Sequence, residues 1–368
     1  MNLTKTLMAT TALTVGAGLA QAQDMANSMT IVSWGGAYQN SQVQAYAEPY
    51  KKMHPEVEVI WDESSNEAVA KLRAQNEAGN ITWDLVDVTA ADAMRLCDEG
   101  LAMEYDPDEL LAPGDDGTPA SEDFGDFIVS DCFIPQIVYS TTFGYRTDLV
   151  GDTPPTSLCA IFDLDAYPGK RSLEKRPINN MEWALMCDGV ANDEIYDVLA
   201  TEEGQEQALA KLETIKDNVV WWSAGADTPQ LLADGEVVMG STYNGRLFSV
   251  IEEQDQPVAM LWDGQVYDYD GWIIPTGLPE DRLARVKDFV KFATDTQRLA
   301  DQAAYISYGP ARKSSAPLVG QHADLGIDMA PHMPTDPANA TNVLLPNFEF
   351  WADYRDDIDA KFQAWLAQ

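Results

Sequence analysis

The chain has 368 residues, of which 45% are hydrophobic, and a formal net charge of −37. A chain of this length is expected to form about two domains. So negative a surface disfavours nucleic acid and anionic lipid as partners, because their phosphate groups would be repelled. The charge by itself identifies no ligand, since an acidic surface also arises as a general adaptation that keeps a protein soluble.

The first 22 residues have the composition of a secretory signal peptide. Lys5 precedes a stretch of small and apolar residues from Leu7 to Leu19, and residues 20–22 end the segment with a small-x-small pattern. The apolar stretch is too short and too rich in Ala, Gly and Thr to span a membrane stably. We therefore expect a soluble periplasmic protein that is cleaved after Ala22.

Four cysteines follow: Cys97, Cys132, Cys159 and Cys187. In an oxidising compartment an even number of cysteines favours disulfides. None lies in a CxxC pair, which argues against a zinc ribbon or a thioredoxin-type redox site. We expect the two sequence-local pairs, Cys97–Cys132 and Cys159–Cys187, and the alternative is four buried free thiols.

The first part of the exported chain alternates predicted strands with predicted helices. This β-α-β-α order, with helices long enough to cross back over the strands, favours a parallel sheet. A segment rich in Pro, Gly and Asp, residues 104–126, then predicts a long surface loop. The strands are expected at 29–34, 57–61 and 83–88, and the helices at 37–53, 66–78 and 90–98.

A strand-like segment at 132–146 crosses an expected domain boundary, after which the α/β alternation resumes. Residues 266–275 are expected to be extended, and a helix over 280–298 continues into 300–306. The last helix is amphipathic, and we expect its stripe to be core: Phe350, Tyr354, Ile358, Phe362 and Trp365. Further helices are expected at 179–189, 192–199, 203–217, 227–234 and 245–253, and strands at 218–222, 237–242 and 258–262.

No catalytic motif is apparent in the sequence. The three histidines, His54, His322 and His332, have no plausible nucleophile beside them. No G-x-S-x-G, P-loop or H-E-x-x-H motif occurs. We therefore expect a protein that is not an enzyme and that holds no cofactor and no metal. A secreted hydrolase or metal-dependent enzyme is the weaker alternative.

A series of motifs in a fixed order extends over nearly the whole exported chain. Behind the export signal, this series resembles the periplasmic substrate-binding proteins of ABC importers, and among them the spermidine/putrescine-binding family. The motifs are Thr30-Ile-Val-Ser-Trp34-Gly-Gly, Val59-Ile-Trp-Asp62-Glu-Ser-Ser-Asn66-Glu, Trp83-Asp84-Leu-Val, Val219-Val-Trp-Trp222, Gln230-Leu-Leu-Ala-Asp-Gly-Glu236, Ser241-Thr-Tyr-Asn244-Gly-Arg246 and Asp268-Tyr-Asp270-Gly-Trp-Ile-Ile-Pro275.

The resemblance implies an α/β fold of two lobes, the type II periplasmic-binding-protein fold, with the ligand in a cleft between them. The lobes would close by hinge motion. Lobe 1 would comprise residues 29–136 plus 271–309, and lobe 2 residues 137–270 plus 310–368. The strands at 132–140 and 266–275 would be hinge crossings. We expect a monomer that delivers its ligand to an ABC permease in the inner membrane.

The ligand that this resemblance implies is a polyamine, which needs aromatic faces for its ammonium groups and carboxylates for its charge. Trp34 and Thr89 end two strands at the edge where open α/β sheets bind ligands. Tyr243 occupies the stacking position of the family's aromatic-Asn-Gly turn. Tyr308 is a weaker candidate at the third crossing. For Trp34 and Tyr243 the alternative is a packing role.

Residues 266–275 give the sharpest prediction of a site. In an extended strand Asp268, Asp270 and Trp272 point to one face. Two carboxylates and an indole at a hinge could hold an ammonium group. The family's ligand-binding aspartate matches Asp270, whereas Asp268 falls where the family often has an aromatic residue. The alternative is that both aspartates are solvated, as many are in so acidic a chain.

One departure from the family pattern concerns the second lobe. Where polyamine binders have acidic residues before a helix, this chain has Arg176 and Asn179. If Arg176 faces the ligand, it would repel a second ammonium group and favour a carboxylate; alternatively, Arg176 points to solvent.

We predict a receptor for a small cationic amine of the putrescine or spermidine type. The alternative within this class is a zwitterionic ω-amino acid, with its amine on the aspartates and its carboxylate near Arg176.

Overall fold

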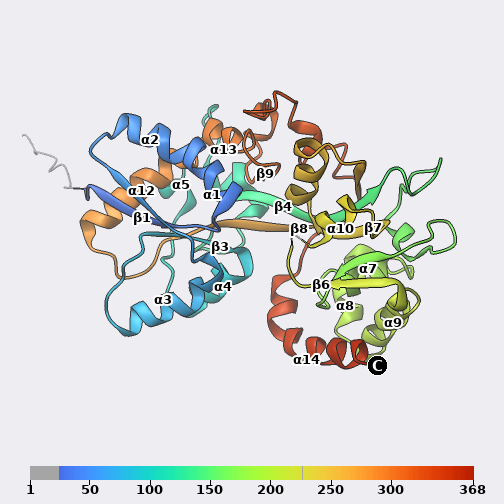
Figure 1. Cartoon of the computed structure of the whole chain (residues 1–368). Coiled ribbons are helices and arrows are strands. Elements are labelled where there is room, and N and C mark those ends of the chain that lie inside the picture. The colour runs from blue at the N-terminus through green and yellow to red at the C-terminus, as the bar shows by residue number, and fades with distance from the viewer. Residues whose placement is uncertain (1–24, 226) are drawn as a thin grey trace, which may run out of the picture.

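The computed structural model describes residues 25–225 and 227–368, so the predicted signal peptide lies outside the described residues. The strands form one sheet in the order β2-β1-β3-β8-β4-β7-β5-β6, with β9 paired to β4 and β10 paired to β8. Helices flank this sheet in two halves, and β4 and β8 run from one half to the other (Figure 1). The predicted α/β fold of two lobes is confirmed.

The strands of the first half pair in parallel, as the sequence predicts. β1 pairs with β2 on one side and with β3 on the other. The predicted helix at 37–53 is present as α1 and α2 with a π-helical stretch, Val43–Ala47, between them. The bounds are β1 (Ser28–Val32), α1 (Gly36–Gln42), α2 (Glu48–Met53), β2 (Glu58–Asp62), α3 (Ala68–Glu77), β3 (Leu85–Thr89), α4 (Ala90–Asp98), α12 (Glu280–Ala293) and α13 (Thr296–Gln302).

This half buries apolar side chains on both faces of its sheet. Leu85, Tyr46 and Phe289 belong to a core under the π-helical stretch, α2 and α12. Val86 belongs to a second core under α3 and α4, because successive strand residues point to opposite faces. Burial of each large apolar side chain stabilises the fold by roughly 1.5–3 kcal/mol. The elements of this half are called lobe 1 below.

The segment at 104–126 differs from the predicted surface loop. It contains two short helices, α5 (Pro107–Leu110) and α6 (Ala120–Phe124). Leu111 and Phe124 are completely buried in the lobe 1 core. The Pro, Gly and Asp residues dominate the composition of the segment, but its few apolar residues fix its ends against the core.

Two long antiparallel strands join the lobes, β4 (Ile134–Arg146) and β8 (Val258–Ile273). The sequence predicts separate segments at 258–262 and 266–275, and the structure makes them one strand with a register shift. Gly264 lies at this shift with φ +72°, and a Cβ there would come 2.5 Å from the Leu158 side chain. A third connection, β9 (Gly309–Pro310), pairs with β4.

The second half, called lobe 2 below, also packs helices on both faces of its strands. A large core lies between the sheet and α7, α8, α9 and α14, and a smaller one lies under α10 and α11. The bounds are β5 (Arg171–Glu174), α7 (Asn180–Met186), α8 (Ile195–Leu199), α9 (Glu202–Glu213), β6 (Val219–Trp222), α10 (Asp227–Ala233), β7 (Met239–Tyr243), α11 (Asn244–Phe248), β10 (Val343–Leu344) and α14 (Phe348–Leu366).

The C-terminal helix α14 matches the predicted apolar stripe except at one position. Phe350, Ile358, Phe362 and Trp365 are buried in the lobe 2 core. Tyr354 is 37% exposed and stacks on Phe350 at the surface, so its prediction as a core residue is wrong. The Tyr354 ring lies over Phe350 at the surface and does not enter the core.

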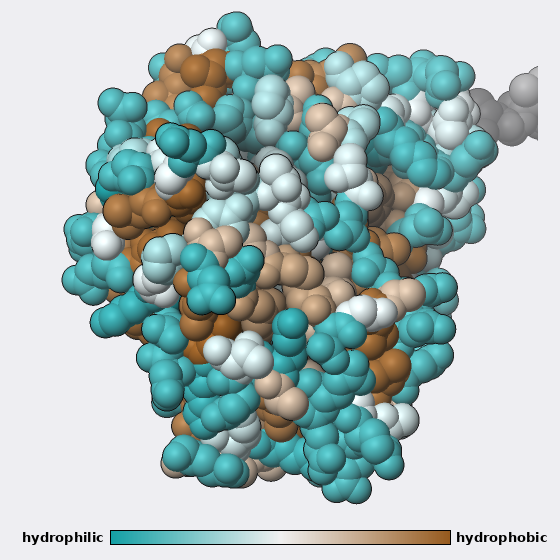
Figure 2. Space-filling view, turned by 90° about the vertical axis from the view of Figure 1, so that its right-hand side faces the viewer, coloured by the Kyte–Doolittle hydropathy of each residue, from teal (hydrophilic) through white to brown (hydrophobic). Residues whose placement is uncertain are grey.

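Hydrophilic residues dominate the face shown in Figure 2, and hydrophobic residues form separate patches among them. Isolated apolar residues are normal on protein surfaces. Within residues 25–225 and 227–368, no helix combines the length and the apolar character that crossing a membrane requires.

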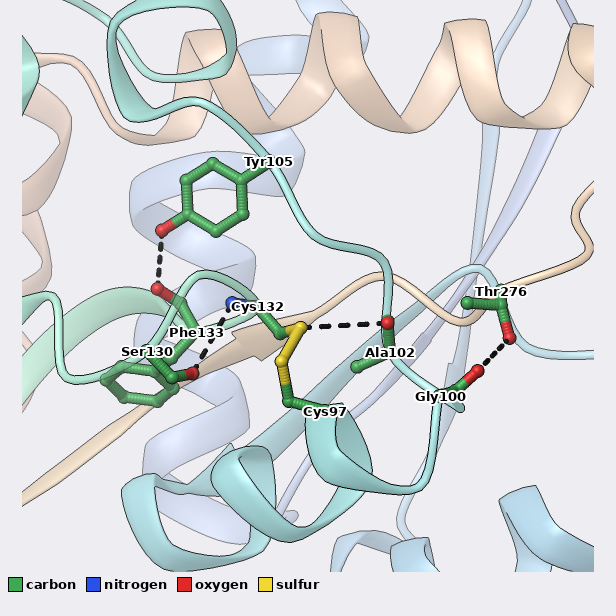
Figure 3. The surroundings of a disulfide bond; sticks show 8 residues. All are labelled: Cys97, Gly100, Ala102, Tyr105, Ser130, Cys132, Phe133 and Thr276. Carbon is green, nitrogen blue, oxygen red and sulfur yellow. Dashed lines mark hydrogen bonds between the residues drawn. A yellow bond between two sulfur atoms is a disulfide. The ribbon is translucent and has the colours of Figure 1, made fainter.

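Both predicted disulfides are confirmed, Cys97–Cys132 and Cys159–Cys187. The first joins the last turn of α4 to the segment before β4 (Figure 3). Nearby, the Tyr105 hydroxyl donates to the carbonyl of Phe133. This disulfide therefore ties a lobe 1 helix to the start of a strand that crosses between the lobes.

Removal of the second disulfide by a Cys159→Ser/Cys187→Ser double substitution is expected to lower the free energy of unfolding by about 2–4 kcal/mol. The bond closes a loop with a sequence separation of 28, and its loss increases the conformational entropy of the unfolded chain. Urea unfolding of both proteins without reductant measures the difference. Equal midpoints and slopes would contradict this expectation.

Candidate functional site

The crossing strands bring two aspartates and several tyrosines onto one face of the sheet. Asp268 is paired with Tyr139 of β4, and Asp270 is paired with Thr89 of β3. Directly opposed residues of antiparallel strands share a face. The Tyr139 hydroxyl donates to Oδ2 of Asp268 at 2.9 Å. Thr89 also caps α4, because its hydroxyl accepts the N–H of Asp92.

Aromatic rings from four segments surround these carboxylates. The ring centre of Tyr139 lies 5.7 Å from those of Tyr243 and Tyr308. Trp34 packs against the same cluster, which also contains Tyr38. The structure thus brings the predicted Trp34, Tyr243 and Tyr308 together with two tyrosines that the sequence analysis missed. The position of Tyr139 depends on the register of β4 against β8, for which the local sequence gives no signal.

The two aspartates have different surroundings. Oδ1 of Asp268 accepts the N–H of Tyr269 at 2.8 Å, and Oδ2 accepts the Tyr139 hydroxyl. Asp270 is 8% exposed, and among the described residues its buried Oδ1 has no hydrogen-bond partner. Burial, and then the negative charges of neighbours led by Asp268, raise the pKa of Asp270 well above its usual range. Asp270 is therefore the carboxylate that a bound cation would satisfy.

A third carboxyl group lies in the same region. Asp87 is completely buried and accepts hydrogen bonds from Gln42 at 2.8 and 2.9 Å, Gln136 at 2.7 Å and Tyr38 at 3.2 Å. Burial raises the pKa of Asp87 to about 7, against the opposing effect of these donors. The sequence analysis missed Asp87, although a charged residue inside an apolar strand is itself a signal of a buried polar site.

Trp272 does not join the site. Its ring is completely buried and packs edge-on against Tyr46, with 5.5 Å between ring centres, and at a tilt against Phe289, with 6.0 Å between ring centres. Trp272 shares a strand face with Asp270, as predicted, but the helices α2 and α12 and the π-helical stretch cover that end of β8. The expectation that its indole faces a ligand does not hold, and we leave it out of the candidate site.

Arg176 lies on the lobe 2 side of these tyrosines. Its Nε is 2.6 Å from Oε2 of Glu174, although the N–H does not point along this line, so the contact is an ion pair without an aligned hydrogen bond. The charge of Arg176 lowers the pKa of Asp268 and Tyr243 against the larger rise that burial causes. With its side chain 34% exposed, Arg176 lies within electrostatic reach of the site.

A buried amide fixes the backbone that presents Arg176. The side-chain N–H₂ of Asn180 donates to the carbonyls of Glu174 and Arg176, both at 2.7 Å. Asn179, the second predicted acidic position, is buried at the start of α7 with φ +72°. Asn179 therefore shapes the turn before α7 and carries no charge. The carboxylate of this segment is that of Glu174, a residue that the sequence analysis missed.

Other chemistry has little support in the described part of the chain. No three or more His, Cys, Asp or Glu side chains there gather in a group that could hold a metal ion. A groove of about 620 Å³ is lined by Met94, Val129, Tyr196 and residues 343–349, among others, but by no residue of the candidate site. We base the site on the unpartnered carboxylate and the tyrosines, because a groove alone does not identify a ligand.

Comparisons with known proteins identify the family. The family model for bacterial extracellular solute-binding protein matches residues 45–335. The gamma-aminobutyric acid (GABA)-binding protein of Pseudomonas aeruginosa is 34% identical over 349 residues, which are 95% of this chain and 94% of that protein.

Solved structures agree in fold. The Atu4243 GABA receptor is 29% identical with a TM-score of 0.75, covering 93% of this chain and 98% of that one. MotA of A. tumefaciens B6, solved in complex with glucopine, is 28% identical with a TM-score of 0.74, and the match covers 92% of this chain and 99% of MotA. The chain therefore belongs to the bacterial extracellular solute-binding proteins, which bind small molecules for ABC transporters.

Proposed function

We propose that this protein is a periplasmic receptor for a small zwitterionic ω-amino acid such as GABA, which it delivers unchanged to an ABC permease. The observation that supports this most directly is that one tyrosine cluster has a carboxyl group with an unpartnered oxygen, Asp270, on one side and a cation, Arg176 beside Glu174 of β5, on the other. We further propose that it acts as a monomer and does not bind nucleic acid. Its high negative charge is unfavourable for a phosphate-rich partner.

The amine end of the ligand would bind at Asp270. An ammonium group there would donate a charge-assisted hydrogen bond to a carboxylate whose Oδ1 otherwise accepts none among the described residues. Tyr139 and Tyr308 offer aromatic faces for additional cation–π contacts. Because both oxygens of Asp268 already accept hydrogen bonds, Asp270 is the better site for a single ammonium group.

The carboxylate end would bind at Arg176. Charge-assisted pairs between Arg and a carboxylate are among the stronger hydrogen bonds, and Arg176 makes no aligned bond with Glu174. A second arginine, the exposed Arg246 in the middle of α11, lowers the pKa of Tyr308 against the larger rise that burial causes, and it is the competing candidate. Neither arginine favours the second ammonium group of a diamine, which weakens the polyamine prediction.

Relatives support the same choice of ligand. A protein that is 34% identical along nearly the whole chain is named for binding GABA, and so is a structural relative of similar fold. GABA carries one ammonium and one carboxylate group, which are complementary to the Asp270 carboxyl group and the Arg176 guanidinium, respectively. The periplasmic location follows the family and the predicted export signal.

The test is isothermal titration calorimetry on protein that has been unfolded and refolded to remove carried-over ligand. We expect GABA to bind at least about tenfold more tightly than either putrescine, which lacks the carboxylate, or butyrate, which lacks the amine. Tighter binding of putrescine than of GABA, or no binding of any ω-amino acid from three to six carbons, would reject the proposal.

The substitution Arg176→Met is expected to weaken GABA binding by about 10–100-fold, because a hydrogen bond to a charged group contributes about 1.5–3 kcal/mol. Arg246→Met is the matched control, since it removes the same charge from α11 and should change the affinity by less than about threefold. The dissociation constants of the three proteins are measured by calorimetry. The reverse ranking of the two variants would move the carboxylate to Arg246.

A further inference from the structure

Glu174, the last residue of β5, is a second carboxylate close to the proposed binding site. Its side chain is 15% exposed, and its buried Oε2 lies 2.6 Å from Arg176 without an aligned donor. Burial raises the pKa of Glu174, while Arg176 and then Arg355 of α14 lower it. Arg176 thus favours the charged form of Glu174 against the larger effect of burial, and the proposed ligand would also use Arg176.

Tyr243 lies between Glu174 and the two aspartates along the sheet, because its strand β7 runs between β5, which carries Glu174, and the pair β4 and β8. Its ring centre is 5.7 Å from that of Tyr139, which donates to Asp268, and 6.4 Å from that of Trp222, the residue paired with Glu174 between β5 and β6. Burial raises the pKa of Tyr243, and Glu174, Asp268 and Asp270 raise it further, whereas Arg176 lowers it. The tyrosine cluster therefore has a carboxylate at each end. Asp270 is at one end without a partner, and Glu174 is at the other end with Arg176 as its partner.

The chemistry of two related solutes makes this arrangement informative. GABA and putrescine share one ammonium end, and the same number of bonds separates it from the carboxylate oxygens of GABA or from the second nitrogen of putrescine. A site that offers Arg176 at the far end suits the carboxylate of GABA. A site of the same length that offers an unpaired Glu174 suits the second ammonium group of putrescine.

We infer that Glu174 is a latent second amine site, and that its pairing with Arg176 determines whether the receptor takes an ω-amino acid or a diamine of the same length. This inference rests on the proposed function. Arg176 acts in two ways: it attracts the ligand carboxylate, and it neutralises the carboxylate that would otherwise hold a second ammonium group. Specificity therefore includes an unfavourable interaction with the diamine as well as a favourable one with the amino acid.

The test compares wild type, Arg176→Met and Arg176→Met/Glu174→Gln, each freed of ligand, by calorimetric titration with GABA and with putrescine. We expect Arg176→Met to bind putrescine at least about tenfold more tightly than the wild type does, and to lose GABA binding by at least about tenfold. The double variant should lose the gain for putrescine. No gain in Arg176→Met, or a gain that persists in the double variant, would overturn the role of Glu174.

Thermal unfolding and circular dichroism establish that each variant is folded. Arg176→Met leaves Glu174 unpaired and should melt at a lower temperature than the double variant. If Arg176→Met does not fold, Arg176→Gln replaces it, since its amide can still donate to Glu174, and a smaller gain for putrescine is expected. If the wild type does not bind GABA, the proposed function is rejected. If Arg176→Met and Arg176→Met/Glu174→Gln bind putrescine with equal affinity, this inference is rejected.

Discussion

Replacing Asp270 by Asn is expected to weaken GABA binding by about a hundredfold or more. Truncating one partner of a buried, hydrogen-bonded charge pair costs about 2–5 kcal/mol, of which each 1.4 kcal/mol corresponds to a factor of about ten. Asn keeps the size of the side chain but cannot pair with an ammonium group as a carboxylate does. Calorimetric titration of the ligand-free variant with GABA measures the loss.

The same substitution is expected to leave the ligand-free protein at least as stable as the wild type at about pH 7.5. The pKa of Asp270 is raised in the fold by burial and by Asp268, so the folded state favours the neutral carboxyl group. Its contribution to stability is fully present below the unfolded pKa and is lost as the pH rises through the folded pKa. An amide has no such loss.

Urea unfolding of the ligand-free wild type and Asp270→Asn at a series of pH values measures the effect of the substitution on stability separately from its effect on GABA binding. Asp87, whose pKa is raised to about 7, adds a slope between about pH 4 and 7 in both proteins and also raises the pKa of Asp270. The two proteins are therefore compared above about pH 7, where Asp87 has largely titrated. The matched control is Asp268→Asn, which keeps Asp270 and should weaken GABA binding much less. If Asp270→Asn is strongly destabilised at neutral pH, Asp270 has a structural partner and is not the amine site.

The sequence predicts those features of the molecule that depend on local pattern. Strand ends identify Trp34 and Thr89, the two-residue period places Asp268 and Asp270 on one face, and the short cysteine separations give both disulfides. These features need only the conformation of one segment and its neighbours along the chain.

Features that depend on packing between distant segments are not predictable in this way. The period of two gives the correct face for Trp272 but not the point along β8 at which helices cover that face. Likewise, Tyr139 joins the site through the register of β4 against β8. Glu174 is visible in the sequence only as part of a basic run, because its pairing with Arg176 depends on the turn that Asn180 holds.

Replacing Arg312 by Met is expected to lower the free energy of unfolding by about 3–5 kcal/mol, because it leaves a buried carboxylate without its cation. Arg312 is completely buried, and its Nε donates to Oδ2 of Asp123 at 2.6 Å. Another of its N–H groups donates to the carbonyl of Thr294, just after α12. Arg312 thus joins α6, the end of α12 and the chain that follows β9.

These contacts also bear on the third connection between the lobes. Ser314 donates to Asp123 through its N–H at 2.9 Å and its hydroxyl at 2.6 Å, and the Ser315 hydroxyl donates to the carbonyl of Thr296 at 2.7 Å. Residues as far as Ser315 are therefore anchored to lobe 1. We propose that lobe 1 extends beyond the expected boundary at residue 309, so that the hinge at this connection lies after Ser315.

The pH dependence and a double variant test this account of Arg312. Burial raises the pKa of Asp123, but the hydrogen bonds from Ser314 and Arg312 outweigh it and the pKa is lowered. A lowered pKa stabilises the fold above the unfolded value, about 3.9, and this contribution is lost as the pH falls through the folded pKa. The loss caused by Arg312→Met, measured by urea unfolding, should therefore be largest near neutral pH and shrink in acid.

The double variant Arg312→Met/Asp123→Leu should recover most of the stability, because no unpaired charge remains buried. A double variant as unstable as the single one would show that the packing of the Arg312 side chain, and not its charge, holds the third connection.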